Sequence, residues 1–355
     1  MKILYITKHN MQENVLKGGE LASKENLDVL REVYGKHNVE ILKIQEEKSI
    51  LKKYINYLFF RDGYSVKEEK RLIEEISKSN AEILYFDGSW FGNLISKCKC
   101  VHKVILFLHN VEKQYSVERM KKNPLTLFKY LSVSFNEKKI IKKADYIFVL
   151  NQRDSNLLKK LYKRQPTCFF PITIKDKYKC TNNTLIEGKY GKYILFVGSY
   201  FKPNVEGITW FINNVMPDIK YKLLIVGKGM EKIKHFETTN VKVLGTVEEI
   251  EPYYQEAQGV VMPIFSGGGM KVKTAEAFMY GKRIFATHEA LLGYDNKKIN
   301  GILECNTPKE FITAINAIDD KIKFSKEIRE YFLENFEYET KKKILNAFNE
   351  KYIGS

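Results

Sequence analysis

The sequence predicts an α/β protein of two domains, and three observations lead to this prediction. With 355 residues the chain is long enough for two domains of ordinary size, each with its own core. Short apolar runs alternate with helical patterns along most of the chain, as in proteins built on parallel sheets. A succession of strand, loop and helix begins at Lys2 and begins afresh at Tyr193, so we expect one such domain in each half.

Composition narrows the class of protein. Hydrophobic residues make up 44% of the chain, and no apolar run approaches the roughly 18 residues that cross a membrane, so we expect a globular protein. The apolar run Met1–Thr7 is too short for a signal peptide, which predicts a cytoplasmic protein. The five cysteines lack paired spacing, and Cys98-Lys-Cys100-Val-His102 matches no standard zinc pattern, so we expect ordinary thiols and no metal.

The net charge of +16, from 59 basic and 43 acidic residues, indicates an anionic partner. No recognition-helix, zinc-finger or RNP pattern occurs, so we do not expect nucleic acid. The anionic inner leaflet of the cell membrane is the partner that we favour.

The first half reads as alternating strands and helices. We expect strands at Lys2–Thr7, Val39–Ile44, Ala81–Phe86, Val104–Leu108 and Ala144–Leu150, with helices after Gly18-Gly19, at Glu68–Lys78 and from Asp154. Gly18 and Gly19 stand at the turn into a helix, as in a Rossmann-like unit.

Two stretches of this half combine basic and apolar residues. Lys52–Arg61 is either a helix packed in the core with solvated lysines, or a contact with a membrane surface or lipid acceptor. Lys113–Lys143 contains nine basic and two acidic residues, with Phe128, Leu131 and Phe135 at helical spacing. It is either a solvated helix face or a surface drawn to anionic lipid, where each basic residue contributes about 1 kcal/mol.

The second half repeats the pattern after a polar linker at Lys175–Lys192. We expect strands at Tyr193–Ser199, Lys222–Gly227, Val241–Gly245, Gly259–Ile264 and Ile284–Thr287, a helix around Trp210 and Phe211, and a long helical tail at Ser325–Ile353. The domains are therefore expected at residues 1–180 and 190–330, followed by a C-terminal helix at 331–355.

The stretch after Ile264 is a glycine loop that leads into a helix. Three glycines end at Gly269, and the helical pattern runs from Lys271 to a C-cap at Gly281. The free N–H groups and the dipole at such a helix start bind phosphate. Lys271 and Lys273 lie in the first turn, where lysine opposes the dipole, and a bound anion would explain their presence.

Glu276 follows Gly269 by seven residues, or about two helical turns, and so returns to the same face roughly 10 Å further along the axis. A carboxylate there could accept both hydroxyls of a ribose whose diphosphate sits at the helix start. The alternative is a plain turn and a helix packed on the sheet, with Glu276 solvated.

Glu276-Ala-Phe-Met-Tyr-Gly281 resembles the donor-site signature of the retaining GT-B glycosyltransferases, the glycogen-synthase-like "group 1" family. The signature reads Glu, seven residues, Glu, Ala-x-x-x-Gly, and its first Glu falls on Gly268 here. The pattern Gly-x-Gly-x-Lys-x-Lys, which the chain has instead, resembles the bacterial surface-polysaccharide branch of the family.

Other segments extend the resemblance. His109-Asn-Val-Glu112 resembles a family motif that would place His109 at the donor sugar; the alternative is a structural histidine. Lys202 is the only basic residue in a loop where the family has an Arg and a Lys, so Lys271 or Lys273 would replace that pair. The donor-binding residues so implied are Gly18, Gly19, Gly198, Lys202, Asn204, Thr246, Val247, Gly268, Gly269, Met270, Lys271, Lys273 and Glu276, with His109 and Lys271 as catalytic residues.

The resemblance implies a GT-B fold: two Rossmann-like domains that face each other across a cleft, with the C-terminal helix crossing back to the first. It implies retaining transfer of a sugar from a nucleotide sugar, UDP-sugar favoured, to a lipid-linked glycan in capsule or surface-polysaccharide synthesis, at the inner face of the membrane. No Asp-x-Asp occurs, so we expect neither metal nor cofactor. The alternatives are a protein acceptor, a GT-B epimerase, and a catalytically silent partner subunit.

Overall fold

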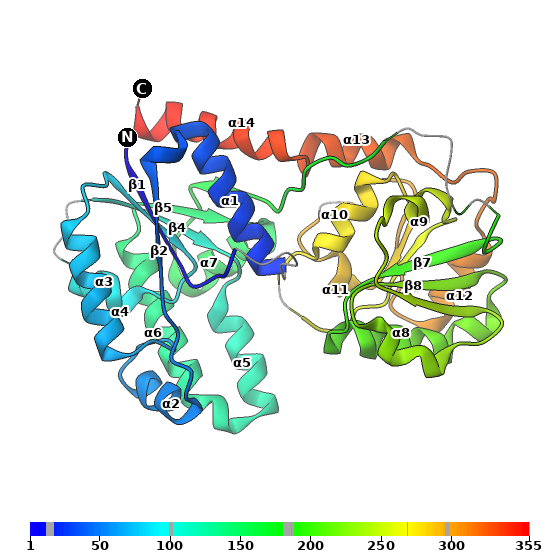
Figure 1. Ribbon diagram of the computed structural model, residues 1–355, viewed down its shortest axis with the longest axis horizontal. Coiled ribbons are helices and arrows are strands. Elements are labelled where there is room, and N and C mark those ends of the chain that lie inside the picture. The colour runs from blue at the N-terminus through cyan, green and yellow to red at the C-terminus, as the bar shows by residue number, and fades with distance from the viewer. Residues whose placement is uncertain are drawn as a thin grey trace. The chain divides into compact units, whose positions relative to one another are not determined.

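The structure is a computed structural model, and it describes residues 1–11, 18–98, 102–179, 186, 188–267, 269–294 and 299–354. The chain forms two compact units (Figure 1). The first contains residues 1–171 and 341–355, and the second contains residues 172–340. None of the described helices is long and apolar enough to cross a membrane.

The first unit is built on a parallel sheet with the strand order β2-β1-β3-β4-β5-β6. The strands are β1 (Ile3–Thr7), β2 (Val39–Lys43), β3 (Ile83–Asp87), β4 (Lys103–Leu108), β5 (Tyr146–Val149) and β6 (Cys168–Phe169). β1 and β3 are buried along their whole length, because helices cover both faces of such a sheet. β2 lies on one side of β1 and the later strands lie on the other, so the strand order reverses between β1 and β3.

The helices of this unit fall close to where the sequence predicts them. They are α1 (Gly18–Tyr34), α2 (Ile50–Leu58), α3 (Val66–Lys78), α4 (Gly92–Lys97), α5 (Glu112–Lys122), α6 (Leu127–Lys143) and α7 (Gln152–Tyr162), with 3-10 turns at Lys36–Asn38 and Pro124–Thr126. Ser65 and Asn151 cap α3 and α7, since each side chain accepts a hydrogen bond from a backbone N–H of the first turn. α4 was not predicted from the sequence.

The second unit has a parallel sheet with the order β12-β11-β10-β7-β8-β9. Its strands are β7 (Tyr193–Val197), β8 (Lys222–Val226), β9 (Val241–Gly245), β10 (Val260–Met262), β11 (Ile284–Ala286) and β12 (Ile302–Glu304). Its helices are α8 (Lys202–Asn214), α9 (Glu251–Glu256), α10 (Val272–Met279), α11 (His288–Leu291), α12 (Pro308–Asn316) and α13 (Lys326–Asn335), with 3-10 turns at Met216–Asp218 and Met230–Phe236. The order reverses between β7 and β10.

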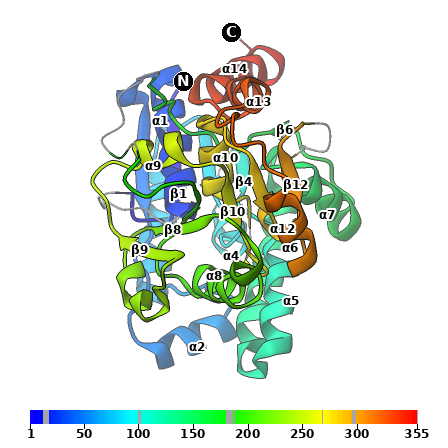
Figure 2. The same cartoon turned by 90° about the vertical axis from the view of Figure 1, so that its right-hand side faces the viewer.

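Aromatic contacts assign these helices to the two faces of the sheet (Figures 1 and 2). Phe211 of α8 meets Phe311 of α12 edge to face, with ring centroids 5.4 Å apart. Tyr254 of α9 stacks on Tyr280 at the end of α10, at 4.5 Å. Described helices therefore cover both faces of the sheet, which leaves its strand ends as the place where ligands are expected.

The C-terminal tail returns to the first unit, as the predicted fold requires. In α14 (Tyr338–Phe348), the buried Lys341 donates a hydrogen bond from Nζ to Oδ1 of Asn26 in α1, at 2.7 Å. The tail that we expected at Ser325–Ile353 is helical but divided: α13 and α14 are separate, so the C-terminal helix does not begin at 331, and a π-helical turn follows at Asn349–Ile353. The break lies where the N–H of Ile174 donates to the carbonyl of Phe336, at 2.9 Å.

Lys282 connects three segments of the second unit. Its side chain is buried, and Nζ donates to the carbonyl oxygens of Gln255, Ala257 and Lys323 at 2.7, 3.1 and 2.6 Å. These carbonyls belong to the end of α9 and to the loop before α13.

We expect Lys282→Met to lower the free energy of unfolding by about 3 kcal/mol, because three carbonyl oxygens, one of them buried, lose their donor. Urea unfolding followed by circular dichroism measures the loss. The exposed Lys321 provides the control, since Lys321→Met should change stability by less than about 0.5 kcal/mol. Equal stability of the two variants would contradict the structural role of Lys282.

Candidate active site

The candidate site of the second unit lies where its strand order reverses. The carboxyl ends of the neighbouring strands β7 and β10 meet there, and ligands of open α/β sheets bind at such points. A glycine follows each strand, Gly198 after β7 and Gly267 in the loop after β10. The backbone at both strand ends is therefore open to close approach by a ligand.

The loop after β10 needs glycine for its backbone conformation. Gly267 and Gly269 have φ angles of 138° and 67°, which disfavour other residues, and Met270 after them is buried. α10 begins at Val272 with no side chain capping its N–H groups. These donors face the end of the loop, as phosphate binding requires. Gly268 lies outside the described residues.

Lys273 is the cation at the centre of this site. Its Nζ donates to Oδ1 of Asn204 at 2.7 Å and lies 4.8 Å from the ring centroid of Phe196. A Cβ atom on Gly198 would lie 3.0 Å from that Nζ, so glycine leaves room for the Lys273 side chain there. Burial first, and the charge of Lys271 second, lower the pKa of Lys273 to about 7, against the opposing charge of Glu276.

Lys271 is already paired, which the sequence did not indicate. Its Nζ lies 2.8 Å from Oε1 of Glu289 in α11 and 2.9 Å from the carbonyl oxygen of Gly269. The Tyr294 hydroxyl donates to the backbone carbonyl of Lys271 at 2.8 Å. These contacts fix Lys271 beside the glycine loop, with part of its charge balanced by Glu289.

Glu276 is half-buried rather than solvated, so the alternative of a solvated helix face is wrong for this residue. Its Oε2 accepts a hydrogen bond from the Tyr254 hydroxyl at 2.9 Å. Burial raises the pKa of Glu276, while Tyr254, Lys177 and Lys273 act to lower it. Among the described residues no donor is seen on Oε1, which leaves an oxygen that a ligand hydroxyl can reach.

Three predicted residues stand apart from this cluster. The Lys202 side chain is 82% exposed, and its Nζ lies 3.6 Å from Oε1 of Glu206, one turn along α8. Thr246 and Val247 follow β9, which is the edge strand beyond β8. The structure thus brings together Gly198, Asn204 and Lys273, and not Lys202.

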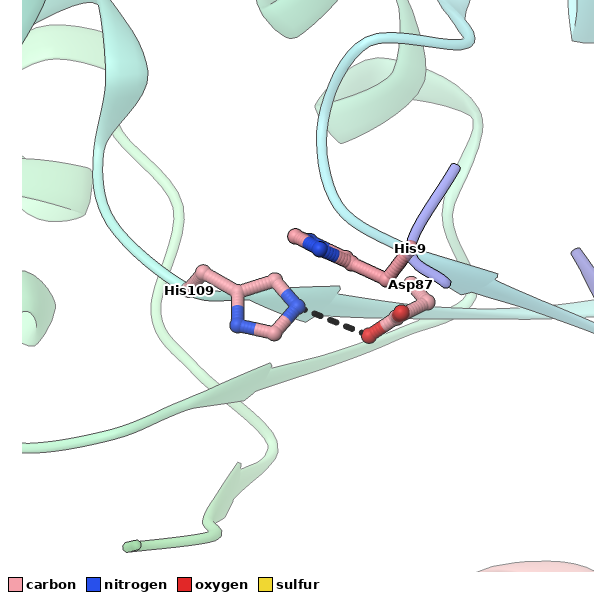
Figure 3. A group of neighbouring side chains, drawn as sticks. All are labelled: His9, Asp87 and His109. Carbon is pink, nitrogen blue, oxygen red and sulfur yellow. Dashed lines mark hydrogen bonds and ion pairs between the residues drawn. The ribbon is translucent and has the colours of Figure 1, made fainter. Parts of the chain in front are cut away.

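A second cluster lies at the reversal point of the first unit (Figure 3). His9, Asp87 and His109 come from the carboxyl ends of β1, β3 and β4, three neighbouring strands. Nε2 of His109 lies 2.8 Å from Oδ1 of Asp87, and Oγ1 of Thr7 donates to Oδ2 at 2.7 Å. The ring centroids of His9 and His109 are 5.1 Å apart. His109 is thus held in place by a buried carboxylate.

Electrostatics keep this carboxylate charged. Burial acts to raise the pKa of Asp87, but the neighbouring His109 and His9 outweigh it and hold that pKa at about 2. Burial lowers the pKa of His9. The N-terminal end of α1 adjoins the cluster, because a Cβ atom on Gly19 would lie 3.3 Å from Cε1 of His9. Gly18 is the first residue of that helix.

Within the described ranges, His9, Asp87 and His109 are the group whose side chains could hold a metal ion, with ligand atoms within 4.8 Å of one another. A metal at Nε2 of His109 would have to replace the hydrogen bond to Asp87. The Sγ atom of Cys98 donates to the carbonyl oxygen of Leu94 at 3.4 Å, and Cys100 of the cysteine pair lies outside the described residues. Independence of metal remains a prediction.

Sequence reasoning missed Tyr254, Glu289, His9 and Asp87. Asp87 carried a recognisable signal, since it directly follows the apolar run Ala81–Phe86 and so ends a buried strand. Tyr254 and Glu289 carried none, because their contacts with the site depend on the packing of α9 and α11.

Comparisons with known proteins bear on the fold of the whole chain and on the family of the second unit. Residues 191–320 match the model of the family "Glycosyl transferases group 1". Sucrose-phosphate synthase from Thermosynechococcus elongatus has a similar structure, with a TM-score of 0.74, 14% identity and full coverage of both chains. HepE from Anabaena in complex with UDP has a TM-score of 0.66 and 13% identity, and the match covers 98% of this chain and 99% of HepE. WaaG, a glycosyltransferase involved in lipopolysaccharide biosynthesis, has a TM-score of 0.63 and 13% identity, and the match covers 99% of each chain.

No curated protein matches the sequence. The structural similarity over whole chains shows that the fold is GT-B, as the sequence predicted. Together with the family match of the second unit, it supports a glycosyltransferase enzyme.

Lys273 predicts a pH dependence of anion binding. Free protein loses the charge on Lys273 as the pH rises through about 7, so affinity for a diphosphate diester should fall by up to tenfold per pH unit above that point. Calorimetric titration measures it, with a ligand whose own charge is constant near neutral pH. Lys273→Arg should bind with no such slope, because arginine stays protonated, and Lys273→Met should bind weakly throughout. A wild-type slope that persists in both variants would assign the titration to another group.

Proposed function

We propose that this protein is a retaining glycosyltransferase of the surface-polysaccharide branch. It moves a sugar from a nucleotide sugar, with UDP-sugar favoured, to a lipid-linked glycan during synthesis of bacterial capsule or cell-surface polysaccharide. The observation that carries the proposal is the group formed by the glycine loop, Lys273, Asn204 and Glu276 at the β7–β10 reversal, within the unit that matches the family model. The Anabaena HepE structures with UDP and with UDP-glucose support the choice of donor.

The donor diphosphate would lie at the N-terminal end of α10. The uncapped N–H groups there and the Lys273 ammonium provide the positive charge. Oε1 of Glu276 would accept hydrogen bonds from the ribose hydroxyls, while its Oε2 is held by Tyr254. Backbone groups of Thr246 and Val247 would contact the base. The Lys202 side chain is exposed and lies beside Glu206, so we expect it to contact the donor at its periphery rather than at the diphosphate.

In the proposed reaction, the bond between the anomeric carbon and the diphosphate oxygen breaks and the acceptor oxygen bonds to the same face of the sugar. The departing oxygen takes the acceptor proton, so no protein carboxylate has to act as nucleophile. Lys271 and the helix start stabilise the charge that develops on the leaving group. His109, oriented by Asp87, is the residue that we propose beside the reacting sugar.

The lipid-linked acceptor places the reaction at the inner face of the membrane. Two proteins with similar structures support a cell-surface glycan as the acceptor: WaaG is involved in lipopolysaccharide biosynthesis, and WaaB is a lipopolysaccharide outer core galactosyltransferase. A catalytically silent partner subunit is the second candidate, because Gly268 stands where the family has a glutamate. Such a subunit would bind no donor.

Glu276→Ala should weaken donor binding by about ten- to a hundredfold, at 1.4 kcal/mol for each factor of ten, because the ribose loses its acceptor. A thermal-shift panel of nucleotide sugars identifies the donor, and calorimetry then compares the variants. Glu206→Ala, which removes an exposed carboxylate of α8, should bind normally. If the folded wild type binds no nucleotide sugar, the silent-subunit reading replaces the enzyme.

Lys271→Met should lower turnover by roughly a hundredfold, because the leaving group loses a fixed cation. Transfer assays with the donor found above measure this, and proton NMR of the product reports the anomeric configuration, which should match that of the donor. Chelation with EDTA should leave wild-type activity largely intact. Activity that disappears with EDTA and returns with a divalent ion would refute the metal-free mechanism, and an inverted product would refute retention.

A further inference from the structure

Helix α2 exposes its apolar side instead of burying it. An amphipathic helix of a globular protein normally turns its apolar stripe to the core. In α2 the side chains of Ile50, Leu51 and Leu58 are 74%, 72% and 52% exposed, whereas the residue that the helix buries is Asn56. The sequence alternative of a helix packed in the core by its apolar residues is therefore wrong.

The first turns of α6 show the same inversion. Leu127, Phe128 and Leu131 are exposed, while the polar Ser132 and Asn136 are buried. Asn136 connects the two helices, since its Nδ2 donates to the carbonyl of Phe60, just after α2, at 2.9 Å.

The two exposed stripes belong to one region of the first unit. α2 contacts α6, and both views show it beside α5 and α6 (Figures 1 and 2). The rings of Phe60 and Phe135 stack at 4.0 Å between the two elements. We call the following exposed residues the apolar α2–α6 surface: Ile50, Leu51, Tyr54, Ile55, Leu58, Phe59, Leu127, Phe128 and Leu131.

Positive charge flanks this surface on both sides. Residues 48–61 contain four basic and no acidic residues, and residues 119–131 likewise contain four and none. Of the first four, Lys53 and Arg61 are paired with carboxylates, at 3.2 and 3.0 Å. Lys129 of α6 lies with Nζ 6.0 Å from the ring centroid of Tyr57 in α2, so the two groups of charge meet at the junction of the helices. Large apolar side chains beside lysines are what a helix in the plane of a membrane interface requires.

We propose that the apolar α2–α6 surface inserts into an anionic lipid bilayer, with its apolar side chains below the headgroups and the flanking lysines on lipid phosphates. The same charges argue against a second copy of this chain as the occupant, because two such surfaces would bring their basic residues together. This inference rests on the proposed function in one respect only, namely that the docked enzyme would meet a lipid-linked acceptor in the membrane.

Insertion changes the expected response to salt. Binding through charge alone falls steeply with ionic strength, since the Debye length is about 10 Å at 0.1 M. Apolar burial does not depend on such screening. Bound protein should therefore decrease with salt without disappearing.

The full-length protein should co-sediment with vesicles of phosphatidylethanolamine and phosphatidylglycerol, and at least tenfold less with phosphatidylcholine alone, since several lysines contribute. The double variant Leu51→Ser/Leu58→Ser should bind the anionic vesicles at least tenfold more weakly. Ile322→Ser/Leu333→Ser, which removes two exposed apolar residues of the second unit, is the matched control and should bind as wild type. In a Leu58→Trp variant, tryptophan emission should shift to the blue when vesicles are added.

The proposal is overturned if the wild type ignores anionic vesicles or if the Leu51/Leu58 variant binds them as well as the control does. Self-association that grows with concentration and disappears only in that variant would make a second copy the occupant instead. Calorimetry with the nucleotide sugar, without lipid, separates this proposal from the proposed function. The Leu51/Leu58 variant should bind donor normally, and loss of donor binding in the wild type would refute the function and leave the membrane surface standing.

Discussion

Both units depend on the reversal of strand order in a parallel sheet. At that point the connections of two neighbouring strands leave in opposite directions, so that no crossover helix covers their carboxyl ends. In the second unit these ends carry Gly198 and the loop with Gly267 and Gly269, and in the first they carry Thr7 and Asp87. Asn204, Lys273 and Glu276 lie on helices that adjoin the second reversal point, and His109 follows β4, the strand next to the first.

The two reversal points differ in the sign of the charge that they hold. The first holds a carboxylate, Asp87, that two histidines keep ionised in spite of its burial. The second holds two lysines on one helix turn, and Lys271 already has Glu289 as a partner. Lys273 has only the neutral Asn204 as hydrogen-bond partner among the described residues, so its charge is the one that an incoming anion would stabilise.

Much of the fold could be predicted because buried strands of parallel sheets read as short, wholly apolar runs. β3 and β7 were found this way, whereas β6, with two residues, and β12, with its exposed positions, carry too little of that pattern. Helical periodicity predicted that Glu276 lies in a helix, and α10 confirms this. Its partner Tyr254 could not be predicted, because that contact arises from the packing of α9 on α10.

The tail and α2 failed for a different reason. The helical pattern of the tail continues through Phe336, but α13 ends there, and the Phe336 carbonyl accepts a hydrogen bond from Ile174, a residue distant in sequence. In α2 the amphipathic pattern is clear, but periodicity does not say which side faces the protein. The side that faces the protein is set by the tertiary structure, which in α2 buries Asn56.

The return of residues 341–355 to the first unit also sets an order for folding on the ribosome. The second unit is one continuous segment and has its whole sequence once Thr340 has been made. The strands of the first unit are synthesised early. Asn26 of α1, however, lacks its hydrogen-bond partner until Lys341 is made, more than three hundred residues later. The unit that is synthesised first is therefore the last to be completed, and until then the surface of α1 that receives α14 stays open to chaperones.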